Sequence, residues 1–191
     1  MCNPGACTLC CLIHHVLLVC TGDRAPRRAP IREVHVSSSG DFGATRIGAS
    51  DFDDADLGDQ VEVSSSGLAG WHIGDGADRR LLRLLRERGY DGSEHRARQF
   101  TPGWFAQLDL VLAADQGHLK ALRAMAHDPA DRDKIHLMRE FDPEAVAADT
   151  LDIDDPYYGT FEDFERCLAE VEAAAKGVVE HIQTQLATPT A

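Results

Sequence analysis

Short apolar runs alternate with amphipathic stretches along much of the chain. Each run is bounded by Gly, Asp or Ser and is too short for a helix, which is typical of a buried strand. The runs predict strands at residues 15–20, 61–64, 108–114 and 134–138. Between and after them, apolar residues recur at three- and four-residue steps, which predicts helices over 78–88, 118–125 and 161–186. Strands that alternate with helices predict a parallel sheet covered on both faces.

The last predicted helix has the most regular pattern. Thr160 and Asp163 stand where a capping box would begin it. Its apolar positions follow the helical period: Phe161, Phe164, Leu168, Val171, Ala175, Val178, Ile182 and Leu186. We therefore expect one face of a long helix to cover the sheet near the end of the chain.

The helical period is absent between residues 23 and 56. This segment contains several arginines and prolines, followed by Gly-, Ser- and Asp-rich sequence. A chain of 191 residues fits one domain. We predict a single α/β domain over 15–187 with an irregular segment at 23–56. We expect the N-terminal extension over 1–14 to be disordered, and residues 188–191 to form a tail.

The net charge and the hydropathy of the chain argue against several classes of partner and location. The formal net charge of −13 argues against nucleic acid or an anionic membrane surface as the main partner. No apolar run approaches the roughly 20 residues that span a bilayer, and the N-terminus lacks the basic region of a signal peptide. The sequence therefore predicts a cytoplasmic protein.

Five of the six cysteines lie in the first twenty residues. This clustering fits a reducing compartment better than a secreted disulfide framework. Cys7 and Cys10 form a CxxC motif, but a structural zinc site usually needs a second ligand pair further along, and the sequence offers none. We predict no metal site.

Two places carry candidate chemistry. Cys20 ends a predicted strand and is followed by a Gly-containing loop, where amides and a helix dipole would lower the thiol pKa and hold an anion. The alternative is a cysteine that is simply a small buried apolar residue. Asp155-Pro156-Tyr157-Tyr158 reads as a surface loop with an acid beside an aromatic wall, or alternatively as an acidic turn whose tyrosines pack on the core.

Taken together, these motifs resemble the low-molecular-weight protein tyrosine phosphatases. That family has a strand ending in V-C-x-G-N, a C-x5-R-[ST] phosphate loop and a distant D-P-Y-Y. The chain matches over residues 15 to 22 and about 57 to 186, with these pieces in family order: Val19-Cys20-Thr21-Gly22, Ser65-Ser66-Gly67, Gly70-Trp71-His72-Ile73-Gly74, His95-Arg96-Ala97-Arg98-Gln99, Asp109 to Asp115, Phe141-Asp142-Pro143 and Asp155-Pro156-Tyr157-Tyr158.

The resemblance implies a three-layer α/β fold with a four-stranded parallel, flavodoxin-like sheet. It implies hydrolysis of phosphotyrosine in proteins, or of a small aryl phosphate, without metal or organic cofactor. The Cys20 thiolate would attack phosphorus, and Asp155 would protonate the leaving phenolate and later activate water.

The resemblance also assigns the remaining site residues. Thr21 and Gly22 would belong to the phosphate loop, and Tyr157 and Tyr158 would border the cleft. The other two assigned positions, Ser65 and His95, would support that loop from behind.

The phosphate loop departs from the family pattern. The arginine expected six positions after Cys20 is replaced by Pro26, and Arg27 follows one residue late. Three hypotheses remain open. The protein is a working phosphatase in which Arg27 binds phosphate, or a pseudophosphatase that binds phosphoprotein with little turnover. The third hypothesis is a damaged sequence, in which residues 23 to about 56 derive from a frame error or a mis-specified segment. A thioredoxin-coupled arsenate reductase is disfavoured, because it needs two further cysteines and only Cys167 follows the middle of the chain.

Overall fold

The structure, a computed structural model, is an α/β protein and describes residues 15–21, 31–36, 51–52, 54–57 and 60–187. The predicted extension 1–14 and tail 188–191 lie outside these residues. The elements run in the order β1 (His15–Thr21), β2 (Ile31–Val36), β3 (Glu62–Gly67), α2 (Arg79–Glu87), the 3-10 helix η1 (Pro102–Gln107), β4 (Leu110–Ala113), α3 (Gln116–Met125), α4 (Pro129–Arg132), β5 (Ile135–Leu137), the 3-10 helix η2 (Met138–Phe141), α5 (Pro143–Ala148) and α6 (Phe161–Ala187). The strands and helices expected from the periodicity are all present.

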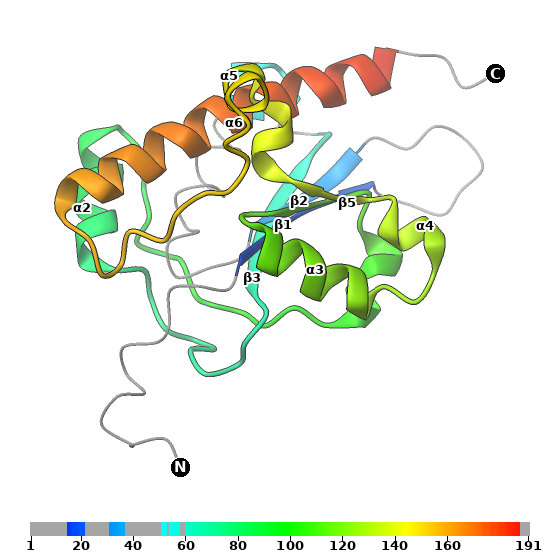
Figure 1. The fold of residues 1–191 in the computed structure, drawn as a ribbon, viewed down its shortest axis with the longest axis horizontal. Coiled ribbons are helices and arrows are strands. Elements are labelled where there is room, and N and C mark those ends of the chain that lie inside the picture. The colour runs from blue at the N-terminus through cyan, green and yellow to red at the C-terminus, as the bar shows by residue number, and fades with distance from the viewer. Residues whose placement is uncertain (1–14, 22–30, 37–50, 53, 58–59, 188–191) are drawn as a thin grey trace.

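A central sheet separates two helical layers (Figure 1). Its strand order is β2-β3-β1-β4-β5. Strands β2 and β3 pair in parallel, as do β4 and β5, whereas β1 is antiparallel to β2, β3 and β4. The described sheet therefore has five strands where four parallel strands were expected, and β1 alone runs against the others.

The length of the first connection explains this difference. A parallel crossover takes a dozen or more residues and usually contains a helix. Only residues 22–30 separate β1 from β2, so β2 returns antiparallel to β1. Strand β2 thus lies in a segment for which no element was predicted.

Strand β4 forms the centre of the hydrophobic core. All four of its residues are buried, and successive side chains point to opposite faces of the sheet. Leu110 and Leu112 join a cluster with α2 and α6, while Val111 and Ala113 join a second cluster with α3 and η1. Burial on both faces is typical of a strand inside a three-layer α/β fold.

Helix α6 spans one face of the sheet beside α2 and α5 (Figure 1). Its start is fixed as predicted, because the Asp163 carboxylate accepts hydrogen bonds from the backbone N–H and the hydroxyl of Thr160. Arg88 at the end of α2 forms an ion pair with Glu172 of α6, with 2.8 Å between Nη1 and Oε2. This ion pair connects α2 to α6.

Among the described residues, no helix is both long and apolar enough to cross a membrane.

Candidate active site

The loop that carries Asp155 is fixed to the carboxyl end of β4. The backbone N–H of Ile153 donates to the carbonyl of Ala114 at 2.9 Å, directly after β4. The carboxylate of Asp152 accepts a 3.0 Å hydrogen bond from the N–H of Gln116 at the start of α3. In open α/β sheets ligands bind beyond the carboxyl ends of the strands, and the loop lies at that edge of β3 and β4.

Asp155 has the properties of a proton donor. Burial raises the pKa of its carboxyl to about 6, although the hydrogen bond from the Tyr157 N–H and the charges of Arg80 and His118 oppose the rise. Oδ1 accepts that hydrogen bond at 3.0 Å. Oδ2 is buried and has no hydrogen-bond partner among the residues that the structure describes. A carboxyl with a pKa near working pH suits general acid–base chemistry.

The two tyrosines of the loop form an aromatic edge beside Asp155. Their rings pack edge to face, with centroids 5.1 Å apart. Tyr158 is 62% exposed and Tyr157 is half-buried, so the pair offers ring surface to solvent. Such a surface can contact a flat aromatic ligand.

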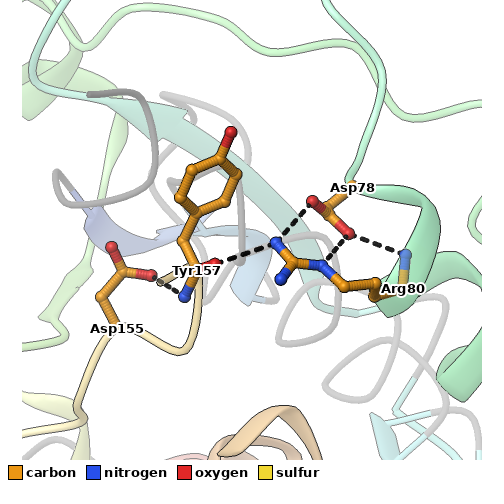
Figure 2. Close-up of polar contacts among 4 residues, drawn as sticks. All are labelled: Asp78, Arg80, Asp155 and Tyr157. Atoms are coloured by element: carbon orange, nitrogen blue, oxygen red, sulfur yellow. Dashed lines mark hydrogen bonds and ion pairs between the residues drawn. The ribbon is translucent and has the colours of Figure 1, made fainter. Parts of the chain in front are cut away.

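Arg80 connects this loop to α2 (Figure 2). Its Nη2 donates to the carbonyl of Tyr157 at 3.0 Å and to Asp78 Oδ2 at 3.1 Å, while Nε donates to Asp78 Oδ1 at 3.1 Å. The guanidinium also lies over the rings of Tyr157 and Phe164, at 5.2 and 4.4 Å from their centroids. Asp78 itself caps the start of α2.

Ser65 and His95 lie near the same edge of the sheet. Ser65 is a buried residue of β3, and its backbone pairs with Leu17 of β1. The segment after His95 is fixed to the end of β3, because the N–H of Gly67 donates to the carbonyl of Arg98 at 2.7 Å. Burial, followed by the charges of Arg98 and Arg96, lowers the pKa of His95 to about 4. The imidazole is therefore neutral at pH 7.

The structure does not bring Cys20 next to Asp155. Cys20 pairs with Glu62 at the beginning of β3, whereas Val16 pairs with Ala113 at the end of β4. The carboxyl end of β1 is thus at the edge opposite to the Asp155 loop, about 13 Å along the strand from Val16 at ~3.3 Å per residue. Thr21 ends the same strand.

Two further predicted site residues, Gly22 and Arg27, lie outside the described residues. Within the part of the chain that is described, no group of three or more His, Cys, Asp or Glu side chains is arranged to hold a metal ion. The expectation of a metal-free site is left as a prediction.

Sequence reasoning missed Arg80. It lies six residues after the Gly70–Gly74 motif in a run of arginines, where nothing in the pattern distinguishes it from Arg79 or Arg83. The sequence placed Asp78 at the start of the predicted helix 78–88. Its position two residues before Arg80 is the one local signal that could have indicated an interaction between the two side chains.

The structure defines a three-layer α/β protein with a partly buried carboxyl in a Tyr-Tyr loop beyond β4. The comparisons with known proteins give its family. The family described as low molecular weight phosphotyrosine protein phosphatase matches residues 42–188. The chain belongs to this family. The matched range begins after Cys20.

Curated relatives match over almost their whole length. A low molecular weight protein-tyrosine-phosphatase from Streptomyces coelicolor is 42% identical over 175 residues, which covers 92% of this chain and 97% of the relative. Low molecular weight protein-tyrosine phosphatase A from Mycobacterium bovis is 35% identical over 173 residues, covering 91% and 94%.

Solved structures support the fold. Wzb of Vibrio vulnificus in complex with benzylphosphonate aligns with a TM-score of 0.60 at 26% identity, covering 73% of this chain and 88% of that one. A protein tyrosine phosphatase from Entamoeba histolytica aligns with a TM-score of 0.70 at 22% identity, covering 75% and 89%. The predicted α/β class and the predicted family are confirmed.

Proposed function

We propose that the protein hydrolyses phosphotyrosine in proteins through a cysteinyl-phosphate intermediate. The observation that carries the proposal is the buried Asp155 carboxyl, whose pKa is raised to about 6 in an Asp-Pro-Tyr-Tyr loop of a chain that belongs to the phosphatase family. Asp155 protonates the phenolate that leaves, so the electron pair of the broken P–O bond departs on a neutral phenol. It then takes a proton from the water that cleaves the P–S bond.

The Cys20 thiolate is the proposed nucleophile, and Arg27 is the proposed phosphate-binding arginine. In-line attack requires the thiolate and the proton donor on opposite sides of one phosphorus atom, and therefore at one edge of the sheet. Turnover by Cys20 and Asp155 thus requires an arrangement in which β1 runs in the same direction as β3 and β4. Thr21 and Gly22 would then contribute to the loop around the phosphate.

A second candidate function follows from the direction of β1. With Cys20 at the edge opposite to Asp155, the tyrosine edge and the Asp155 loop support binding of a phosphotyrosine segment without turnover. This is the pseudophosphatase alternative.

Hydrolysis of phenyl phosphate by the purified full chain separates the two candidates. For the enzyme we expect turnover that Cys20→Ser abolishes. The absence of turnover in the wild-type protein, together with saturable binding of a phosphotyrosine peptide, would replace the enzyme with the binding protein.

The proposed partners are a tyrosine-phosphorylated protein or a small aryl phosphate. We propose a cytoplasmic location, which is supported by the absence of a membrane-crossing helix among the described residues and by the clustered cysteines of the sequence.

A further inference from the structure

Arg80 contacts both the Asp155 loop and Asp78 at the start of α2. Its Nη2 is shared between the Tyr157 carbonyl at 3.0 Å and Asp78 at 3.1 Å, and its Nε is bonded to Asp78. Its flat faces are taken up by the rings of Tyr157 and Phe164. Two of the three guanidinium nitrogens, Nε and Nη2, thus donate hydrogen bonds to α2 and the loop.

The backbone of Tyr157 connects Arg80 to Asp155. The carbonyl of Tyr157 accepts from Arg80, and the N–H of the same residue donates to Asp155 Oδ1 at 3.0 Å (Figure 2). One residue of the loop is therefore held on both sides. A rotation of its backbone would break the hydrogen bond to Asp155 as well as the bond from Arg80.

We propose that Arg80 is a positioning residue for the proton donor: by holding the Tyr157 carbonyl, it fixes the carboxyl of Asp155 for proton transfer to the leaving phenolate. This inference rests on the proposed function. Asp78 orients the guanidinium with two hydrogen bonds, so the chain of contacts runs from the start of α2 to Asp155. Because Arg80 acts through the backbone of Tyr157, it needs no contact with substrate.

The charge of Arg80 also affects the pKa of Asp155. The groups that face Asp155 are Arg80 from α2, His118 from α3 and Cys167 from α6. Arg80 favours the ionised carboxylate, against the effect of burial. Removal of this charge leaves burial less opposed, so the pKa of Asp155 rises further above its ordinary value.

The test compares two substrates. In Arg80→Ala we expect kcat/KM to fall about 10- to 100-fold for phenyl phosphate, which is part of the 10²–10⁴-fold that a positioned general acid supplies. For p-nitrophenyl phosphate, whose phenolate leaves without a proton, we expect a loss of less than about threefold. Arg80→Lys restores the charge and one donor but cannot reach Asp78 and the carbonyl together, so it should recover part of the loss.

Arg83→Ala is the matched control. It removes a neighbouring arginine of α2 that forms an exposed ion pair with Glu87 and lies over Phe161, and none of these contacts reaches the Asp155 loop. We expect both substrates to be hydrolysed at the wild-type rate. An equal loss for both substrates in Arg80→Ala would mean that Arg80 only supports folding, and would overturn the inference.

Carboxyl NMR titration keeps the inference testable without turnover. The resonance of Asp155, assigned by its loss in Asp155→Asn, should titrate at higher pH in Arg80→Ala than in the wild type and be unchanged in Arg83→Ala. An unshifted titration would overturn the inference. A wild-type protein that is inactive on both substrates would instead overturn the proposed function, and the NMR result would still decide the role of Arg80.

Discussion

At the residue scale, Asp155 is subject to opposing effects. Burial favours its protonated form, while the Tyr157 N–H and the charges of Arg80 and His118 favour the carboxylate. Burial prevails, and the pKa lies near 6 rather than near the ordinary value of an aspartic acid. A proton donor must carry its proton at working pH, and this balance keeps a fraction of Asp155 protonated close to neutrality.

This balance predicts the pH dependence of the reaction. Because the protonated form of Asp155 is the active one, we expect kcat/KM for phenyl phosphate to fall about tenfold per pH unit above about pH 6. Asp155→Asn should lower kcat/KM by about 10²–10⁴-fold at pH 5.5 and remove that fall. Initial rates between pH 5 and 8 test this, with Asp154→Asn as the neighbouring control. A fall that survives in Asp155→Asn would assign the titration to another group.

Some residues of the candidate site could be predicted from the sequence and others could not. Asp155, Tyr157 and Tyr158 stand in one contiguous motif, so their common loop could be recognised from the letters alone. Arg80 could not be found in this way, since its partner is a backbone carbonyl 77 residues further along the chain. Every residue has a backbone carbonyl, so the sequence does not show which of them accepts a hydrogen bond from a side chain.

At the element scale, α6 makes one close backbone approach. A Cβ added at Gly177 would overlap the carbonyl oxygen and carbon of Phe141 in η2. Both partners are backbone, so the overlap cannot be relieved by a rotamer change. The glycine therefore allows α6 to pack directly against the segment that leads into α5.

We expect Gly177→Ala to destabilise the protein despite the higher helix propensity of alanine. Overpacking typically costs about 1–3 kcal/mol, which exceeds the roughly 1 kcal/mol that the substitution contributes in an exposed helix. Thermal or urea unfolding measures the difference. Glu180→Ala, at an exposed position one turn further along α6, should change the free energy of unfolding by less than about 0.5 kcal/mol. An unchanged or raised stability in Gly177→Ala would show that α6 does not pack on η2 as described.

Helices with a sustained apolar pattern and strands that form continuous apolar runs were predictable, whereas the short helical turns and β2 were not. Helix α6 repeats its apolar pattern over many turns, and β4 is a continuous apolar run, so both follow from hydrophobic periodicity. The 3-10 helices η1 and η2 and the short α4 are too brief to show a period. Strand β2 lies in a segment of arginine and proline, and its place depends on pairing with β1 and β3 rather than on its own pattern.

At the scale of the whole molecule, the net charge of −13 bears on substrate choice. Like charges repel over about 10 Å at 0.1 M salt and over only about 3 Å at 1 M. Phosphopeptides flanked by Lys or Arg should therefore have a higher kcat/KM than peptides flanked by Asp or Glu, by about tenfold at low salt. We expect the ratio to approach one in 1 M NaCl, with p-nitrophenyl phosphate as the control for general salt effects. A ratio that does not depend on salt would indicate direct contacts instead.

The anchoring of the Asp155 loop has a consequence for how the family can diversify. Two hydrogen bonds hold the loop, and their acceptors are the backbone carbonyls of Ala114 and Tyr157. Every amino acid provides such a carbonyl. Substitutions of the side chains at these two positions leave the acceptors in place. Descendants of this sequence can thus retune the acidity of the proton donor, by exchanging the neighbours that bury or charge it, without relocating the donor itself.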